Sequence, residues 1–433
     1  MDFPGTDTLE TVVDDITLPR FARVRYEPET PELDDVEGTV RTQLDELPLS
    51  DLEAGTIVAV GVGSRGIDRI ALVAETVVDE LAGRGFEPVV VPAMGSHGGA
   101  TPEGQREALA SYGVTEERLG CDIDARMETT TLGTADHGFA VEWSTAALDA
   151  DASLVINRVK AHTNFQAVFE SGLTKMAVIG LGKQAGAQTT HENALTTGYE
   201  AVLRDAFCVI RRESNLVGGV ALVENFYDRL AAIEAIPAAD LPDGEGPLLA
   251  RADEYMPTLP YDELDVLVVD RMGKDISGAG MDTNVIGRYN VLNTDDPAEP
   301  DISRIYVRSL TEASHGNGAG IGLADLTRRK LVENLDLDQV YTNTLTSSSL
   351  QKAHLPVVLP NDDFAVREAL TSVGTYDPTE IRVAWIRDTG HLDVFRISEA
   401  LVGETDGALT VEGWDRLSFE NGEAVFTPES GTD

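Results

Sequence analysis

Four polar side chains in the first half of the chain follow predicted apolar strands, at the points where those strands end. Arg65 and His97 each stand in a glycine-containing loop, and Lys160 and His162 follow the third strand. Ligands of open α/β sheets bind outside the carboxyl ends of the strands, so we expect these side chains along one edge of a sheet. An arginine there can hold a carboxylate with two hydrogen bonds, and a histidine can take and return a proton near neutral pH.

Each of these residues also has a plainer explanation. Arg65 could bridge surface carboxylates in so acidic a protein, and His97 could be a surface histidine in a glycine loop. His162 could be bonded to a neighbouring carbonyl group, and Lys160 could be structural. The residue types therefore favour acid–base chemistry on a carboxylate without excluding a structural role.

Lysine is scarce in this sequence, and its distribution singles out one segment. The chain has six lysines against 27 arginines, and Lys160, Lys175 and Lys183 fall within 24 residues of one another. We predict that Lys175 begins an apolar strand over residues 175–181. A lysine that enters a buried strand needs a carboxylate partner or has a chemical role.

A third histidine, His191, is predicted in the first turn of a helix over residues 189–211, where Thr189 and Glu192 have the spacing of a capping box. The helix dipole disfavours a protonated imidazole at this end of a helix. Because a neutral imidazole is the form that binds a metal, the position favours His191 as a metal ligand. The alternative is an exposed polar residue at a helix start.

The elements that would position these residues alternate between apolar strands and amphipathic helices. The predicted strands are residues 56–62, 87–91, 153–159, 175–181, 217–223, 264–269, 304–307 and 381–386. The predicted helices are residues 68–81, a helix from Thr101, residues 189–211 and a helix near 325–335. This alternation predicts an α/β fold with mainly parallel sheets.

A segment rich in Pro, Asp, Glu and Gly, residues 237–261, is typical of a linker. We therefore predict two α/β domains, residues 1–255 and 256–433, with a cleft between them. Return of the final segment to the first domain is an alternative arrangement.

Composition limits the class of protein. The net charge is −42, and the acidic residues are spread along the whole chain, which indicates a halophilic protein and argues against nucleic acid as a partner. Cys121 and Cys208 are the only cysteines, so a disulfide framework and a cysteine-based metal site are excluded. No apolar run reaches 18 residues, and the acidic N-terminus is not typical of a signal peptide or membrane anchor. We expect a cytoplasmic protein.

Taken together, these motifs resemble the nickel-pincer lactate racemase family. The shared pattern is a strand-end arginine loop, the Gly-x-His loop at Gly95, then His162, the Ser-Gly-x-x-Lys run that ends at Lys175, and His191. The resemblance covers residues 50–225 well and the rest of the chain in outline.

The resemblance implies an isomerase, a racemase or epimerase of a 2-hydroxy acid that passes hydride from the α-carbon to a nickel-pincer nucleotide. It implies that Lys175 holds this cofactor through a covalent thioamide link and that His191 binds the nickel. His97 and His162 correspond to the pair of acid–base histidines, and Arg65 to the arginine that orients the substrate carboxylate. The other expected neighbours of the cofactor are Ser64, Gly95, Gly172 and Lys183, with Lys183 facing phosphate.

The sequence departs from the family pattern at two places. The family's Asp-His-Thr-Arg loop is replaced by Val-Gly-Ser-Arg at residues 62–65. Its second-domain Tyr-Gln is followed shortly by a Lys, whereas residues 274–284 have neither Gln nor Lys at the matching spacing. The small residues 278–280 would leave room for a larger hydroxy acid or a sugar acid. The expected substitute contacts to substrate are Lys274, Asp275, Asn284 and Arg288.

Two other function classes fit the same residues. A metal-assisted enzyme without the pincer would use His97, His162 and His191 as ligands, whereas a non-catalytic protein would bind an organic anion between its domains. Covalent modification of Lys175 separates the racemase from both. The glycine-rich run 315–322 lacks the spacing of a dinucleotide loop and the lysine of a P-loop, so we predict a mobile loop there.

Overall fold

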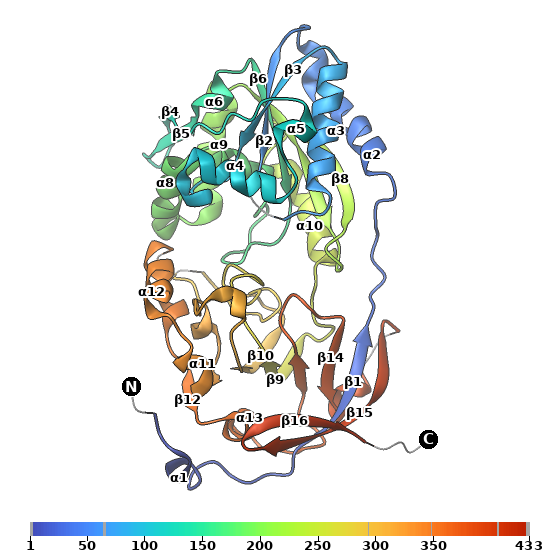
Figure 1. The fold of residues 1–433 in the computed structure, drawn as a ribbon, viewed down its shortest axis with the longest axis vertical. Helices are drawn as coiled ribbons and strands as arrows, with labels where there is room; N and C mark the ends of the chain where they lie inside the picture. The colour runs from blue at the N-terminus through green and yellow to red at the C-terminus, as the bar shows by residue number, and fades with distance from the viewer. Residues whose placement is uncertain (1–2, 64–65, 293, 348, 405–406, 430–433) are drawn as a thin grey trace. The chain divides into compact units, whose positions relative to one another are not determined.

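The computed structural model describes residues 3–63, 66–292, 294–347, 349–404 and 407–429 (Figure 1). The chain divides into two compact units. The central unit is Thr30–Met256, and the split unit joins Met1–Glu29 to Pro257–Asp433. The first 29 residues, which we predicted in the first domain, therefore belong to the second unit.

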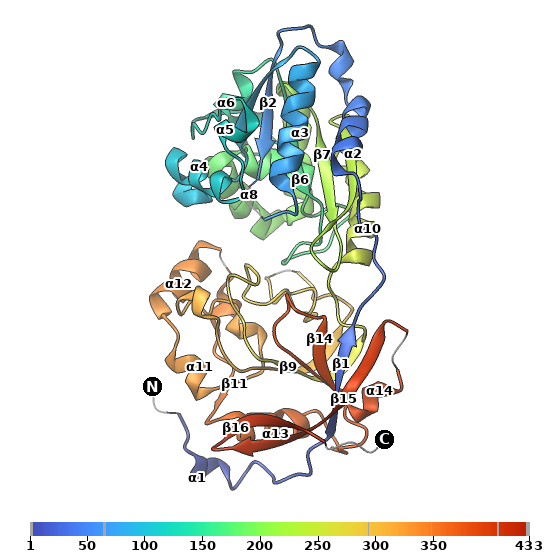
Figure 2. The ribbon, with the colours of Figure 1, turned by 45° about the vertical axis from the view of Figure 1, so that its right-hand side comes forward.

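One strand explains this difference. Strand β1 (Arg20–Tyr26) pairs antiparallel with β14 (Val394–Ser398) on one side and β15 (Leu409–Glu420) on the other. Figure 2 shows these three strands side by side. The hydrogen-bond partners of the β1 backbone thus lie near the C-terminus. Because β15 belongs to this same sheet, the final segment does not return to the first domain.

The central unit contains a five-stranded sheet. The strands lie in the order β3 (Glu87–Pro92), β2 (Ile57–Val62), β6 (Ala152–Arg158), β7 (Leu216–Glu224) and β8 (Leu230–Pro237). The first four are parallel, and β8 runs antiparallel to β7. The predicted α/β fold class is confirmed, and its four parallel strands lie within two residues of their predicted bounds.

Helices cover both faces of this sheet, which is why its strands are apolar throughout. On β2, Val58 and Val60 pack in one buried cluster with α3 (Ile70–Gly83), whereas Ala59 packs in the other with α9 (Tyr199–Glu213). The remaining helices of eight or more residues in this unit are α2 (Val36–Gln43), α4 (Pro102–Ser111), α8 (Lys183–Thr197) and α10 (Gly246–Tyr255). A short hairpin, β4 (Thr129–Thr134) and β5 (Ala140–Ser144), completes the unit.

Two local predictions are wrong, and a third is correct only in part. Residues 175–181 form no strand: α7 (Leu173–Lys175) leads into a π-helical turn (Met176–Gly180) and then into α8. A short apolar run does not distinguish a buried strand from a buried helix, which explains the error. The predicted helix 189–211 is two helices, α8 and α9, separated at Gly198, which has a φ of 89°. The predicted linker, residues 237–261, contains the boundary between the two units after Met256, but most of it is structured: α10 lies within it and buries Leu248 and Leu249.

The described part of the split unit contains a nine-stranded sheet. Its parallel half is β12 (Val357–Leu359), β11 (Leu326–Arg328), β10 (Asp301–Val307), β9 (Glu263–Val269) and β13 (Val383–Ile386). The antiparallel half continues through β14, β1 and β15 to β16 (Glu423–Pro428). Its helices include α11 (Arg329–Glu333), α12 (Leu337–Thr346) and α13 (Asp362–Thr371). The helix predicted near 325–335 is therefore a strand, β11, followed by α11.

The glycine-rich run 315–322 is a closely packed connection between β10 and β11. A Cβ atom at Gly318 would lie 2.3 Å from Leu335, one at Gly320 would lie 1.7 Å from the Ala279 carbonyl oxygen, and one at Gly322 would lie 2.1 Å from the Gln351 carbonyl oxygen. Every second residue must therefore be glycine because another chain segment occupies the space of its side chain. This packing contradicts the prediction of a mobile loop.

Within the described residues, none of the helices has the length and apolarity that crossing a membrane requires.

Candidate active site

The loop after β6 carries His162 and is closed by its own hydrogen bonds. The backbones of Lys160 and Ser171 exchange two hydrogen bonds of 3.0 and 3.2 Å, which bring the two ends of the loop together. Inside the loop the Glu170 carboxylate accepts from the backbone N–H of His162 and, at 3.0 Å, from that of Ala167. Glu170 thus fixes the backbone on which His162 stands.

The His162 ring has a defined tautomer. It is 9 % exposed, and its Nδ1 accepts a hydrogen bond of 3.1 Å from the backbone N–H of Asn164. An imidazole nitrogen that accepts carries no proton, so in the neutral ring the proton lies on Nε2. His162 is therefore arranged to give a proton from Nε2.

Two aromatic side chains connect His162 to His191. The ring centroid of Phe165 lies 4.4 Å from that of His162 and 5.0 Å from that of Tyr199, with which it is stacked. Tyr199 begins α9, and its hydroxyl lies 3.2 Å from Nδ1 of His191 on α8. The break at Gly198 between the two helices allows this pairing. The structure thus brings the rings of two predicted histidines close to one tyrosine ring, with centroid distances of 5.8 Å for His162 and 5.9 Å for His191. The sequence analysis did not identify this tyrosine.

Lys175 lies at the end of α7, and its charge affects the pKa values of His191 and Glu170. The α7 segment is held at its start by Glu245, a 2 % exposed carboxylate that accepts from the backbone N–H groups of Leu173 and Thr174. A Cβ atom at Gly172 would lie 2.0 Å from Oε1 of Glu245. Gly172, predicted beside the cofactor, is therefore explained by the room that the Glu245 carboxylate needs.

The His191 pKa is lowered, but for a different reason from the one predicted. His191 is the ninth residue of α8, so it lies beyond the first turn and the helix dipole has little effect on it. Desolvation of the ring by surrounding protein lowers the pKa first, although more than a third of the residue is exposed, and the nearby Lys175 ammonium lowers it further. A neutral imidazole is still the expected form, which suits metal binding.

The Glu170 pKa is shifted in the opposite direction. Burial raises it to about 7, while the hydrogen bonds from His162 and Ala167 and the charge of Lys175 oppose the rise. Lys175 therefore acts electrostatically on both Glu170 and His191. These residues, with His162 and Tyr199, form the group that we call the histidine cluster.

The loop of His97 packs on the helical segment that carries Lys175. Gly95 donates a hydrogen bond of 3.1 Å from its backbone N–H to the Gly180 carbonyl, and its φ is 58°. The buried amide of Gln105 donates to the carbonyls of Gly95 and His97 at 3.1 and 3.3 Å. His97 itself is exposed. Gly95 is thus a residue of close backbone packing, which places the His97 loop next to the segment after Lys175.

Lys183 supports the loop of His97 through hydrogen bonds. It is 0 % exposed and donates to the Pro92 carbonyl at 2.7 Å and to Oε1 of Gln105 at 3.4 Å. Burial lowers the pKa of this lysine to about 8. The protein itself accounts for Lys183, so its position gives no support to the predicted contact with a cofactor phosphate.

Arg65 and Ser64 lie outside the described residues. Gly63, the residue before them, lies close to the histidine cluster. A Cβ atom at Gly63 would lie 2.6 Å from Cε of Met176, which follows Lys175 in the sequence.

The four predicted substrate residues of the second half lie in the split unit and have protein partners. Arg288 donates to the Leu323, Ile302 and Ser303 carbonyls and to Asp325, so it ties backbone segments together. Asn284 accepts from the Tyr289 hydroxyl at 2.8 Å. The Asp275 carboxylate accepts from Thr311 and Ser314, and the Lys274 ammonium donates to the Gly278 carbonyl. The position of Arg288 argues for a structural role.

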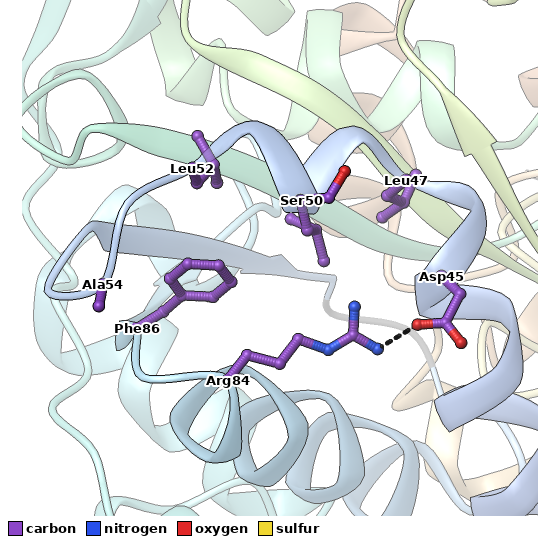
Figure 3. A pocket seen from close by; sticks show the side chains of 8 residues that line it. Asp45, Leu47, Ser50, Leu52, Ala54, Arg84 and Phe86 are labelled. Carbon is purple, nitrogen blue, oxygen red and sulfur yellow. Dashed lines mark hydrogen bonds and ion pairs between the residues drawn. The ribbon is translucent and has the colours of Figure 1, made fainter.

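A pocket of about 300 Å³ lies elsewhere in the central unit (Figure 3). It is lined by Asp45, Leu47, Leu49, Ser50, Leu52, Ala54, Arg84 and Phe86. Ala54 and Phe86 precede β2 and β3, so the pocket is at the amino edge of the sheet, opposite the strand ends that carry His97 and His162. Its charged groups, Arg84 and Asp45, pair with each other at 2.7 Å. It offers no group of reactive side chains.

Metal ligation by side chains alone finds no support. Among the described residues, no group of three or more His, Cys, Asp or Glu side chains is arranged to hold a metal ion. His97, His162 and His191 therefore do not form the three-histidine site of the metal-assisted alternative.

Comparison with known proteins gives one family. Residues 27–202 match the family model described as the lactate racemase N-terminal domain. The predicted resemblance is confirmed over this part of the chain, which contains the whole histidine cluster: the protein has a divergent domain that is similar to the N-terminal domain of lactate racemase. No curated protein matches. Among solved structures, the chain is similar to the lactate racemase apoprotein from Thermoanaerobacterium thermosaccharolyticum, with 14 % identity, coverage of 85 % of this chain and 88 % of that chain, and a TM-score of 0.49.

Proposed function

We propose that this lactate-racemase-like protein is a racemase or epimerase of a 2-hydroxy acid that uses a nickel-pincer nucleotide bound covalently to Lys175. One observation carries the proposal: within the matched domain, Lys175, His191 and His162 gather around Tyr199 and Glu170, although 28 residues of sequence lie between the two histidines.

The donor set fits a metal that arrives with its own ligands. His191 would supply one imidazole ligand, and the remaining ligands would come with the cofactor, since the described residues contain no group of three or more His, Cys, Asp or Glu that could hold a metal ion. If Tyr199 accepts a hydrogen bond from Nδ1–H of His191, the lone pair of Nε2 is available to nickel. Lys175 is only partly buried, so its amine can be reached for modification. When bound, the pincer nucleotide would take hydride from the substrate α-carbon and return it to either face.

The protein residues would move the hydroxyl proton. Inverting a carbon centre in both directions needs one acid–base group on each face of the substrate. We assign these roles to His162 and His97. His162 holds a proton on Nε2 in this structure, which suits the donor, and His97 would accept the proton on the other face. Arg65 would hold the substrate carboxylate.

The direct test is mass spectrometry of the protein purified from cells that make the cofactor, with nickel content measured on the same sample. We expect a nucleotide-sized adduct on the Lys175 peptide, and we expect Lys175→Arg to lose both the adduct and the nickel while the fold remains intact. Arginine keeps the positive charge but cannot form the thioamide. Lys330→Arg, at an exposed lysine paired with Glu423, is the matched control and should load normally.

Two results would count against the proposal. Normal loading of Lys175→Arg would remove Lys175 from the mechanism. An unmodified, nickel-free protein from cells shown to make the cofactor would leave a protein that binds organic anions.

A further inference from the structure

A buried carboxylate, Asp388, lies just beyond the carboxyl end of β13 and is 0 % exposed. Its Oδ2 accepts a hydrogen bond of 2.8 Å from Nε of Arg271, and its Oδ1 accepts one of 2.6 Å from Nδ1 of His391. Nε of Arg387 lies 3.7 Å from Oδ2. One carboxylate thus holds two guanidinium groups and an imidazole at the carboxyl ends of β9 and β13, the kind of sheet edge at which α/β proteins bind ligands.

Backbone hydrogen bonds give these side chains defined positions. Asp388 and His391 are the ends of a tight turn, in which the His391 N–H donates to the Asp388 carbonyl at 3.3 Å. Inside the turn, the Gly390 N–H donates to Oδ1 of Asp388 at 3.0 Å. The Arg271 N–H donates to the Arg387 carbonyl at 3.0 Å, which holds the loop after β9 beside this turn.

The four side chains carry a surplus of positive charge in a protein whose net charge is −42. Among the described residues, neither Arg271 nor Arg387 pairs with any carboxylate other than that of Asp388. Arg308, which follows β10, instead pairs with two carboxylates of its own. Two guanidinium groups therefore share one carboxylate, and an anionic ligand would neutralise the charge that remains.

Several nitrogen atoms that Asp388 does not use are available to a ligand. Nη1 and Nη2 of Arg271 have no hydrogen-bond partner within the described part of the chain, and such a pair of N–H groups can donate in parallel to a carboxylate. Because an ionised carboxylate only accepts, Nδ1 of His391 carries a proton, and in the neutral ring Nε2 is an acceptor. The side chains of Arg271 and His391 are 33 % and 50 % exposed, so a ligand can reach both.

We propose that Arg271, Arg387 and His391 form a binding site for a small hydroxy acid in the split unit. The two arginines would hold the carboxylate, and Nε2 of His391 would accept the hydrogen bond of the hydroxyl group. Asp388 would position Arg271 and His391 without touching the ligand. The ligand class is that of the proposed substrate, and in this respect the inference rests on the proposed function, but the site itself involves no part of the cofactor.

The experiment is calorimetric titration of the purified full chain with each enantiomer of malate, with succinate and with inorganic phosphate, at about pH 8 and constant ionic strength. Malate differs from succinate only by a hydroxyl group on the carbon next to a carboxylate. We expect saturable binding of succinate and binding of at least one enantiomer of malate about fivefold tighter, because malate makes one more hydrogen bond. Phosphate should bind more weakly than either acid.

Two substitutions keep a donor to Asp388 and remove the contact to the ligand. Arg271→Gln leaves an amide nitrogen at the place of Nε but lacks both Nη atoms, and His391→Asn leaves one at the place of Nδ1 but lacks Nε2. We expect Arg271→Gln to weaken the binding of both acids about tenfold and His391→Asn to abolish only the preference for malate. Arg387→Gln should weaken both acids to a smaller extent. Arg41→Gln, at an exposed arginine of the central unit, is the control and should bind as the wild type does.

Thermal unfolding of each variant shows whether the fold is kept, and if Arg271→Gln does not fold, Arg387→Gln and His391→Asn decide. The absence of saturable binding by both acids would overturn the proposal, as would affinities unchanged in both arginine variants. Equal binding of malate and succinate by the wild type, or tighter binding of phosphate, would overturn the assignment to a hydroxy acid. Absence of the Lys175 adduct with this binding intact would contradict the proposed function alone, and the adduct without this binding would contradict this site alone.

Discussion

Glu170 fixes the backbone on which His162 stands, and its own carboxyl group has a raised pKa. It is a buried carboxylate that accepts hydrogen bonds from two backbone N–H groups and lies within range of the Lys175 charge. In the sequence it is one of 75 acidic residues, and nothing in the local pattern marks it. Its role comes from the closure of the loop by Lys160 and Ser171, which only the folded chain shows.

The raised pKa of Glu170 makes a prediction for the pH dependence of stability. The folded state holds its proton up to a pH of about 7, above the ordinary glutamate value of 4.5. The contribution to stability is therefore fully present below about pH 4.5 and is lost as the pH rises through 7, by at most roughly 3 kcal/mol. We expect Glu170→Gln, which cannot ionise, to flatten this decline in the free energy of unfolding between pH 5 and 8.

Denaturant titrations at constant salt measure this effect. The exposed Glu107→Gln is the control, and its free energy of unfolding should decline with pH as in the wild type. The same decline in Glu170→Gln would show that Glu170 is not the group responsible.

At the scale of elements, the segment from Gly172 to Thr197 determines the site. Its short helix begins on the Glu245 carboxylate, its π-helical turn is held by a hydrogen bond of 2.9 Å from the Trp143 indole to the Ala177 carbonyl, and α8 then carries His191. π-helical turns are rare and are often found at functional sites. Because the turn connects Lys175 to α8, it determines the position of Lys175 relative to His191.

Gly172→Ala tests the start of this segment. The new Cβ would lie 2.0 Å from the buried Glu245 carboxylate, so we expect a loss of about 1–3 kcal/mol in the free energy of unfolding. Gly83→Ala, at the end of α3 with nothing within 4 Å of its Cβ position, is the control and should not be destabilising. Similar stability of both variants would mean that Glu245 moves aside without cost.

Gly320→Ala makes the corresponding test in the split unit. Gly320 has a φ of 110°, and its Cβ would meet the Ala279 carbonyl oxygen at 1.7 Å, so we expect a loss of more than about 2 kcal/mol. Gly278→Ala, in the facing loop with open space at its Cβ position, should be close to neutral. Thermal unfolding of the two variants measures the difference, and a neutral Gly320→Ala would restore the mobile-loop interpretation.

At the scale of the whole molecule, the large excess of negative charge is the main feature that affects stability. The 33 basic residues balance fewer than half of the 75 acidic residues, which leaves a net charge of −42. Among the described residues, arginine makes almost all of the ion pairs, including those of the buried Asp362 with Arg308 and Arg328. Repulsion between the remaining carboxylates destabilises the compact state and is screened by salt. Acidic residues outnumber basic residues in both units.

We therefore expect stability to rise with salt. The free energy of unfolding should increase steadily as potassium chloride is raised from about 0.1 M to above 1 M, because the Debye length falls from about 10 Å to 3 Å. Urea titrations at fixed salt concentrations measure this dependence. A free energy of unfolding that does not change with salt would contradict the halophilic interpretation.

The α/β class and the parallel strands of the central sheet could be predicted from the amino-acid sequence, because strands buried on both faces must be apolar. The family resemblance could also be predicted, because the loops at the strand ends carry the polar residues. The sequence also singled out Lys175, His162 and His191. The tertiary structure was needed to show that residues 175–181 are helical, that β1 joins the C-terminal strands, and that Glu170 and Tyr199 contact the predicted site histidines. Those outcomes depend on contacts between residues far apart in the chain, which local propensity and periodicity do not encode.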